Sequence, residues 1–176
     1  MPGNDTVNKV ITVLAVSGSA YLAGFTASIS ILTVPVLYVP SASIATKQWA
    51  RLYGLGAQLG PPMGMSSLAL FAYLAWAHSA SSLTPRGLAF ALAGAFSAAN
   101  MPWTLLTMLP TNNALMAIAK EPAATTAEVE KDPDAKKRRE EEVKTLLGRW
   151  RWLNAARSVG PTIGALLGGA VAVGLI

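Results

Sequence analysis

Charge is confined to one short part of this 176-residue chain. Nine of its 14 lysines and arginines lie between Lys120 and Arg151, and eight of its 9 acidic residues lie between Glu121 and Glu142. Hydrophobic residues make up 52% of the sequence and charged residues only 13%, which is about half the charged share of a soluble domain. Because charge is costly inside a bilayer, this pattern predicts a membrane protein with one water-exposed segment.

Apolar segments of about 20 residues, the length that crosses a bilayer, occupy residues 10–33, 57–77, 87–109 and 154–176. Pro35 and Pro40 are expected to end the first segment, and residues 41–56 to connect it to the second. The charged segment, residues 114–149, separates the third from the fourth. The pattern predicts an all-α fold in which residues 1–176 form a single domain. That domain is an integral membrane four-helix bundle with a long charged loop and helix between the third and fourth spans.

The charged segment itself is predicted to have two parts. Residues 122–133 are expected to be flexible. Asp132, Pro133 and Asp134 then favour a helix start, because they supply a capping side chain, a proline in the first turn and an acid near the positive end of the helix dipole. We therefore expect one helix to begin near Asp134 and to continue into the fourth span.

The distribution of lysine and arginine predicts the orientation. Lys47, Arg51 and the cluster from Lys120 to Arg151 belong to connections on one side of the membrane, whereas only Lys9 and Arg86 lie on the other. Basic connections stay in the cytosol. The chain is thus predicted to be a multi-pass protein of an endomembrane, with its basic loops cytosolic and both termini lumenal or outside.

The composition limits which cofactors and partners the chain is expected to use. There is no cysteine and only one histidine, which excludes iron–sulfur clusters and thiolate zinc and leaves few ligands for any metal. No dinucleotide-binding fingerprint is present. The basic run from Lys136 to Arg139 is followed at once by Glu140 to Glu142, which argues against nucleic-acid binding. We therefore expect no cofactor and no metal.

Polar and aromatic side chains gather at one predicted membrane depth, on the cytosolic side. Trp150, Asn154 and Arg157 are spaced i, i+4, i+7 and so share one face of a helix. Polar groups at this depth must be paired or line a cavity, which makes them a candidate site. Two alternatives stay open: a hydrogen-bonded network that only locks the helices together, and interfacial anchoring by tryptophan and arginine. The candidate residues are Trp49, Tyr53, Thr111, Asn112, Asn113, Trp150, Asn154 and Arg157.

Two further polar residues are interpreted as structural. His78 falls at the opposite end of the second span, about 30 Å from the candidate site, and is read as an interfacial histidine. Asn100 lies inside the third span together with Pro102 and Trp103. A helix kink with a satisfied amide is the favoured interpretation there.

Two motifs carry a resemblance to a known family. LPTNNAL occupies residues 109–115 and RWRWLNAARSV occupies residues 149–159. A four-span chain with these motifs resembles the DUF1772 family, whose fungal members include anthrone oxygenases. The matched positions are Pro110, Thr111, Asn112 and Leu115 in the first motif, Trp150, Asn154 and Arg157 in the second, and an aromatic pair, Trp49 and Tyr53.

The resemblance implies a function and roles for these residues. Family members of this kind oxidise an anthrone, such as emodin anthrone, to the anthraquinone in polyketide biosynthesis, using molecular oxygen as co-substrate and no dedicated metal or flavin. Arg157, Asn112 and Asn154 would stabilise the substrate oxyanion. No acidic residue lies in the spans, so Tyr53, a water molecule or the substrate's own acidity would have to account for loss of the proton. Trp49, Trp150, Thr111 and Asn113 would bind the flat substrate.

Other functions remain open on the sequence alone. A non-enzymatic tetraspan scaffold would anchor a biosynthetic complex, or associate with other pathway enzymes, through its charged cytosolic helix. A small transporter is disfavoured because the spans contain no acidic residue to couple protons. The oxygenase requires a cavity among Asn112, Asn154 and Arg157, whereas the scaffold predicts that these side chains are packed against each other.

Overall fold

The structure is a computed structural model that describes residues 2–79 and 84–176. Within these residues all regular structure is helical and no strand occurs, which confirms the predicted all-α class. In chain order the elements are α1 (Pro2–Ser28), the π-helical turn η1 (Ile29–Thr33), α2 (Val34–Val36), α3 (Ala42–Ala77), α4 (Pro85–Ala98), α5 (Asn100–Trp103), the π-helical turn η2 (Thr104–Met108), α6 (Leu109–Ala119), α7 (Ala123–Lys131), α8 (Pro133–Ala156) and α9 (Val159–Ala172).

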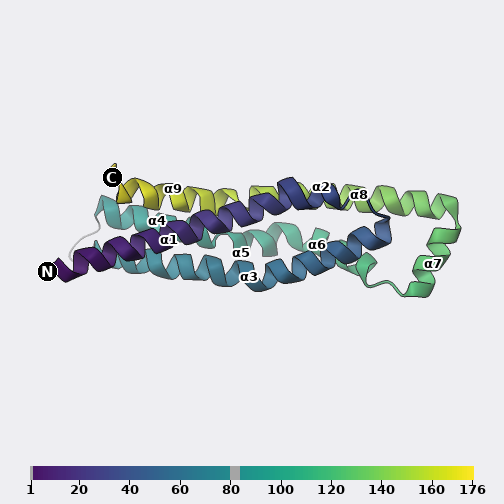
Figure 1. Ribbon diagram of the computed structural model, residues 1–176, viewed down its shortest axis with the longest axis horizontal. Coiled ribbons are helices and arrows are strands. Elements are labelled where there is room, and N and C mark those ends of the chain that lie inside the picture. The colour runs from purple at the N-terminus through teal and green to yellow at the C-terminus, as the bar shows by residue number, and fades with distance from the viewer. Residues whose placement is uncertain (1, 80–83) are drawn as a thin grey trace.

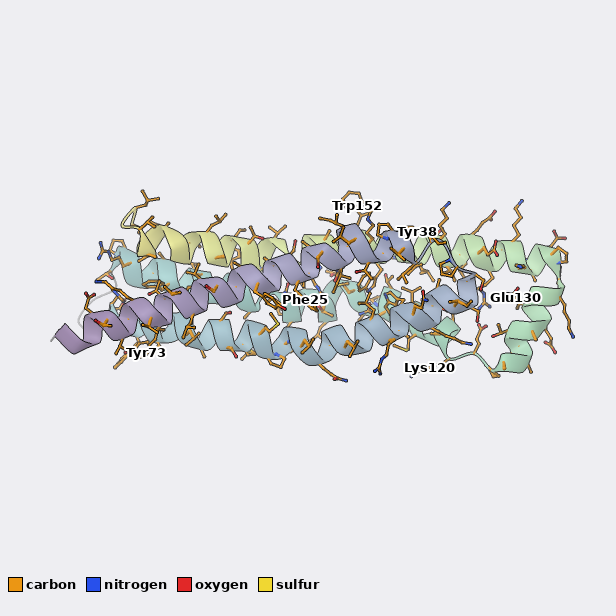
Figure 2. All side chains as sticks on the ribbon, in the orientation of Figure 1. Phe25, Tyr38, Tyr73, Lys120, Glu130 and Trp152 are labelled. Carbon is orange, nitrogen blue, oxygen red and sulfur yellow. The ribbon has the colours of Figure 1, made fainter. Side chains whose placement is uncertain are left out.

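The helices lie side by side as long rods (Figure 1). Helix α1 packs on α3 and α9, and α4 also packs on α3 and α9, so these helices surround a common core. The two chain termini lie at one end of the molecule, and α7 lies at the other. The most highly charged part of the chain is therefore held far from the termini, with Lys120 and Glu130 at the α7 end (Figure 2).

Two stretches of helix are long and apolar enough to cross a membrane. They are Asp5–Val36, with a mean hydropathy of 1.6, and Pro85–Ala119, with a mean hydropathy of 1.2. Helix α9 is shorter than a span, with only 14 residues, and α3 contains Pro61 and Pro62 in its middle.

π-helical turns lie just before prolines in two of the rods. The first rod ends at Val36, one residue after Pro35, which confirms the prediction that Pro35 and Pro40 end it. The π-helical turn η1 lies just before Pro35. The same arrangement recurs in the third rod, where η2 lies just before Pro110. A proline removes one backbone donor and crowds the preceding turn, and a π-helical turn changes the hydrogen-bonding register there. The third rod thereby continues past Pro110 to Ala119.

The connections also differ from the prediction. Residues 41–56 are not a loop, because α3 begins at Ala42 and runs without a break through Pro61 and Pro62. Residues 122–133, expected to be flexible, contain α7. The predicted single helix from Asp134 to the fourth span is wrong, because α8 ends at Ala156 and α9 begins at Val159. Arg157 stands in this interruption.

Ion pairs join α8 to α7 and to a residue shortly before α7. Lys136 of α8 lies 3.2 Å from Glu130 of α7, and Arg139 of α8 lies 2.7 Å from Glu121. Arg139 also lies 3.3 Å from Glu142 in its own helix. That the basic run does not bind nucleic acid stays a prediction.

Small residues bring α9 close to its neighbours. A Cβ on Gly160 would lie 2.7 Å from the Phe96 carbonyl oxygen, and a Cβ on Gly168 would lie 2.6 Å from the Phe71 ring. A Cβ on Gly164, midway between them, would lie 2.7 Å from the Ala93 carbonyl oxygen. The spacing i, i+4, i+8 aligns the three glycines on one helix face. Close approach of helix backbones through such a stripe is typical of helix packing in membranes.

Candidate active site

A cavity of about 170 Å³ lies between α1, α3, the α4–η2 region and α8. Its wall is mostly apolar, with Leu22, Leu52, Met65, Met101 and Leu105 among the lining residues. An apolar ligand would suit such a wall. The polar or partly polar side chains in the lining are Thr26, Tyr53, Asn100, Thr104, Trp150 and Arg157.

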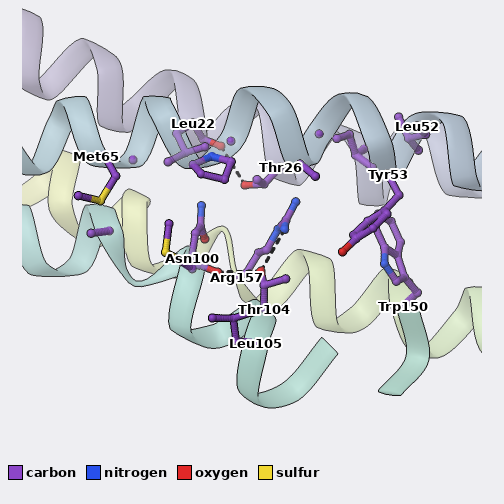
Figure 3. A pocket seen from close by; sticks show the side chains of 18 residues that line it. Leu22, Thr26, Leu52, Tyr53, Met65, Asn100, Thr104, Leu105, Trp150 and Arg157 are labelled. Atoms are coloured by element: carbon purple, nitrogen blue, oxygen red, sulfur yellow. Dashed lines mark hydrogen bonds between the residues drawn. The ribbon is translucent and has the colours of Figure 1, made fainter. Parts of the chain in front are cut away.

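Three of the predicted site residues line this cavity together: Tyr53 from α3, Trp150 from α8, and Arg157 at the end of α8 (Figure 3). Trp49, four residues before Tyr53, stacks on it with ring centroids 5.2 Å apart and an angle of 10° between the planes. Trp49 also meets Trp150 edge to face at 5.9 Å. Trp49 is 0% exposed and stands behind the cavity wall. Its packing therefore fixes the two aromatic side chains that do reach the cavity.

Arg157 reaches the cavity without a carboxylate partner among the described residues. Its Nη1 donates a weak hydrogen bond to the Thr104 hydroxyl at 3.3 Å, and its Nε is buried with no hydrogen-bond partner. The Thr104 hydroxyl in turn donates to the backbone oxygen of Asn100 at 2.7 Å. A cation in an apolar wall with donors left over is arranged to meet an anion or a carbonyl oxygen.

The predicted amides Asn112 and Asn154 do not line the cavity. Asn154 is 0% exposed, and its Nδ2 donates to the Thr26 backbone oxygen at 2.8 Å and to the Ser30 hydroxyl at 2.7 Å. Asn112 accepts a hydrogen bond from Trp150 Nε1 at 2.9 Å. Of the three residues expected to surround a cavity, only Arg157 does so. The two asparagines instead hold helices and Trp150 in place, as the packing alternative predicts.

Two further predicted residues also lie away from the cavity. Asn113 is exposed on the outer face of α6, because it follows the buried pair Thr111 and Asn112 by one step around the helix. Thr111 is 2% exposed, and its hydroxyl has no partner among the described residues. The expected role of these residues in binding the substrate is therefore not supported by their positions.

Sequence reasoning missed Asn100 and Thr104. Asn100 was interpreted as a satisfied amide at a kink, but it lines the cavity and its Oδ1 is buried without a partner. Both residues lie where α4 gives way to α5 and η2. The signal that identifies them is a polar side chain inside an apolar span beside a proline, which is the usual mark of a site at membrane depth.

The cavity opens through the side of the bundle. Three of its apolar lining residues are also exposed on the outer surface: Met65 by 49%, Met101 by 43% and Leu105 by 59%. They come from α3, α5 and η2, so the opening lies between the rods rather than at a charged end. An opening with an apolar rim suits a lipophilic ligand.

No cluster of three or more histidine, cysteine, aspartate or glutamate side chains that could hold a metal occurs in residues 2–79 and 84–176. The single histidine, His78, ends α3 and lies beside Phe90, with ring centroids 5.3 Å apart. Its Nδ1 lies 2.8 Å from the Leu74 backbone oxygen. His78 is absent from the cavity lining. That the protein uses no cofactor stays a prediction.

Known proteins resemble this chain over most of its length. A family model described as anthrone oxygenase matches residues 49–167. An anthrone oxygenase of Paecilomyces divaricatus is 35% identical over 157 residues, which are 88% of this chain and 90% of that protein. An anthrone oxygenase of Claviceps purpurea is 33% identical over 160 residues, 90% of this chain and 86% of that protein. A noranthrone monooxygenase of Aspergillus flavus is 27% identical over 157 residues, 88% of this chain and 70% of that protein. No solved structure matches the chain.

Proposed function

Because this chain belongs to the anthrone oxygenase family, we propose that it is a membrane-embedded, cofactor-independent enzyme that converts a polyketide anthrone to the anthraquinone with molecular oxygen. Family membership makes the chain an oxygenase. Its pathway is secondary-metabolite biosynthesis, and its substrate resembles emodin anthrone. The observation that carries the proposal is Arg157, a cation that lies in the wall of an apolar cavity and has no carboxylate partner among residues 2–79 and 84–176.

The chemistry needs little from the protein. Loss of a proton from the anthrone methylene breaks a C–H bond and leaves the electron pair delocalised onto the carbonyl oxygen, as in a phenolate. The anion reacts with oxygen at the former methylene carbon. One oxygen atom stays there as the new carbonyl, and the other leaves in water, so that anthrone and O₂ give anthraquinone and H₂O. The protein's task is to favour the anion, which a fixed cation does best in a dry cavity.

Arg157 and Tyr53 are the titratable residues among those that line the cavity. We assign Arg157 to the substrate oxyanion and Tyr53 to the transfer of the methylene proton. Trp150 and Tyr53 form the aromatic walls for the flat ring system, and Trp49 supports them. Asn112 and Asn154 are assigned to positioning, because their hydrogen bonds join Trp150 and the helices rather than facing the cavity.

The membrane location is supported by the outer surface of the rods. Large apolar side chains are exposed along it, including Val13 by 63%, Tyr21 by 67% and Leu106 by 81%. A soluble monomer rarely exposes so much apolar surface. We propose that residues 1–176 form one multi-pass domain of an endomembrane, in which each of the long rods crosses the bilayer. Exposed Trp152, which points outwards from α8 (Figure 2), would lie at the interface.

The scaffold alternative explains only part of the structure. It accounts for the packed amides of Asn112 and Asn154. It gives no role to the cavity or to Arg157. A cation in an apolar wall destabilises the fold, and such residues usually mark a functional site. A place beside other enzymes of the pathway is compatible with either function.

The direct test is to incubate membranes that contain the protein with an anthrone and oxygen and to follow the absorbance of the quinone. Membranes from the same host without the protein are the control, because anthrones also oxidise slowly in air. With ¹⁸O₂, one labelled atom should enter each quinone molecule. Quinone formation no faster than in the control membranes would refute the proposal.

Protease digestion should report the proposed topology. Protease added to the cytosolic face of sealed vesicles should cut between Ala123 and Glu142, because α7 and the first turns of α8 carry the basic and acidic residues that stay in water. Tags on the two termini should be protected until the vesicles are opened. Accessible termini together with a protected charged segment would reverse the orientation.

Purified active protein should contain neither a stoichiometric transition metal nor flavin. The reason is chemical: the chain has no cysteine and one histidine, and that histidine ends α3 away from the cavity lining. Elemental analysis and a visible absorption spectrum of the purified protein measure this. Bound iron, copper or flavin in amounts that follow the specific activity would contradict it.

A further inference from the structure

Asn100 stands in the same cavity as Arg157. It begins α5, directly after the interruption that ends α4 at Ala98. Figure 3 shows its side chain standing between Met65 and the Arg157 and Thr104 pair. The Thr104 hydroxyl accepts from Arg157 and donates to the Asn100 backbone. That bridge ties the asparagine and the guanidinium to a single piece of cavity wall.

The Asn100 amide is not used by the protein. Among the described residues, no hydrogen bond joins either its Oδ1 or its Nδ2 to another group. Its Oδ1 is buried without a partner. Its Nδ2 is not among the buried atoms without a partner, and the side chain lines the cavity (Figure 3). A buried amide without partners destabilises a fold. Asn112 and Asn154 each make a hydrogen bond that holds structure, although Asn112 Nδ2 and Asn154 Oδ1 are also buried without a partner. Asn100 differs from both because it lines the cavity.

We propose that Asn100 is the second donor to the substrate oxyanion, so that its Nδ2 and the Arg157 guanidinium bind the same oxygen. The inference rests on the proposed function. It assigns to Asn100 the amide role that sequence reasoning gave to Asn112 and Asn154. The two donors would stabilise the substrate oxyanion in different ways. The guanidinium supplies charge, and the neutral amide supplies a directed N–H that fixes where the oxygen lies.

The step in which Asn100 acts is the ionisation of the bound anthrone. The methylene C–H bond breaks, its electron pair moves onto the carbonyl oxygen, and the proton passes to water or to Tyr53 in its phenolate form. A hydrogen bond to that oxygen is stronger in the anion than in the neutral ketone. Removing the donor should therefore weaken ionisation more than it weakens binding of the neutral ring system.

Anaerobic spectroscopy isolates this step. In the absence of oxygen the bound anthrone cannot be oxidised, and its anion absorbs at longer wavelength than the neutral ketone. Purified full-length protein is saturated with anthrone under argon, and the absorbance is followed against pH. Asn100→Leu should lower the ionisation constant of the bound anthrone by about ten- to hundredfold, as expected for one hydrogen bond to a charged group. Affinity for the neutral anthraquinone should change by less than about threefold.

Further variants separate this role from a structural one. Asn100→Ser keeps a small donor and should restore part of the ionisation that the leucine variant loses. Gln58→Leu is the matched control, because Gln58 is an exposed amide of α3 outside the cavity lining, and it should titrate as the unmodified protein does. If the leucine variant does not fold, the serine variant and Asn100→Asp carry the test, since a carboxylate beside the oxyanion should suppress ionisation further.

The outcomes are distinct. Bound anthrone that ionises equally well in unmodified protein and in folded Asn100→Leu would overturn the inference, as would leucine and serine variants that behave alike. A protein that oxidises no anthrone in any form would refute the proposed function itself. Activity in the unmodified protein, combined with an unchanged titration in the variants, refutes only the role of Asn100.

Discussion

Arg157→Lys should lower kcat for anthrone oxidation by about a hundredfold. Lysine keeps the positive charge but loses the planar fork of N–H donors. Its single ammonium group cannot contact both Thr104 and the substrate oxyanion in the geometry that the guanidinium allows. KM should change far less, because the apolar and aromatic walls bind the ring system before it ionises. Steady-state kinetics on reconstituted protein, with quinone absorbance as the signal, measure both constants.

Arg157→Gln should lower kcat further, to about a thousandth of its starting value. Glutamine removes the charge as well as the fork, so the anion loses its counter-ion in a dry cavity. The variant should still fold, because Arg157 makes only one weak hydrogen bond to a described side chain. Retained circular dichroism together with lost turnover is the expected pair of results.

His78→Ala is the control for both Arg157 variants. His78 ends α3, and its Nδ1 lies by the Leu74 backbone oxygen rather than in the cavity lining. Its kcat should stay within about twofold of the unmodified value. Normal turnover by both Arg157 variants, combined with an inactive His78→Ala, would move the site to the other end of the molecule. The cavity beside Arg157 would then be only a packing defect.

Gly164→Ala should destabilise the fold by about 1–3 kcal/mol, although alanine is the better helix former. A Cβ at this position would lie 2.7 Å from the Ala93 carbonyl oxygen and 3.1 Å from the Ser19 hydroxyl. Ser19 itself joins α1 to the neighbouring helices by hydrogen bonds to Ser97 at 2.7 Å and to the Pro161 carbonyl oxygen at 2.8 Å. The added carbon must push α9 away from α4, which strains these contacts.

Gly169→Ala supplies a matched control in the same helix. Nothing lies within 4 Å of the position where its Cβ would stand, so the substitution should raise stability by about 0.5–1 kcal/mol through helix propensity alone. Thermal unfolding of both variants in one detergent, followed by circular dichroism, gives the comparison. Equal shifts for the two variants would show that α9 does not pack as closely as described.

Much of the site was accessible from the sequence, although not the part each residue plays. The spacing of Trp150, Asn154 and Arg157 predicts one helix face, although Arg157 lies just beyond the last residue of α8. A helix face in a bundle meets more than one neighbour, however. Asn154 therefore reaches Thr26 and Ser30 on the first rod, while Trp150 and Arg157 reach the cavity. Spacing along the sequence cannot distinguish a side chain that packs on a neighbouring helix from one that lines the cavity. It gives the direction in which a side chain points but not which group lies there.

The three asparagines in or beside the apolar spans could not be told apart by sequence alone. Asn100, Asn112 and Asn154 are chemically identical, and each lies in or beside an apolar span. Sequence reasoning chose the two that belong to family-like motifs, and the structure gives both of them hydrogen-bonded positions in the packing. The rotation and the interruption of each helix decide which amide faces empty space. Those depend on contacts between residues far apart in the chain, such as Trp150 with Asn112.

By itself, the sequence determined the helical class, the membership of the family and the isolation of Arg157. These follow from composition and short-range spacing: charge is segregated, the motifs are local, and no acidic residue occurs in the apolar spans to pair with the arginine. The sequence did not predict where α8 gives way to α9 or which polar groups line the cavity. Those features depend on how distant helices pack, because only packing determines which donors are satisfied by protein and which are left for a substrate.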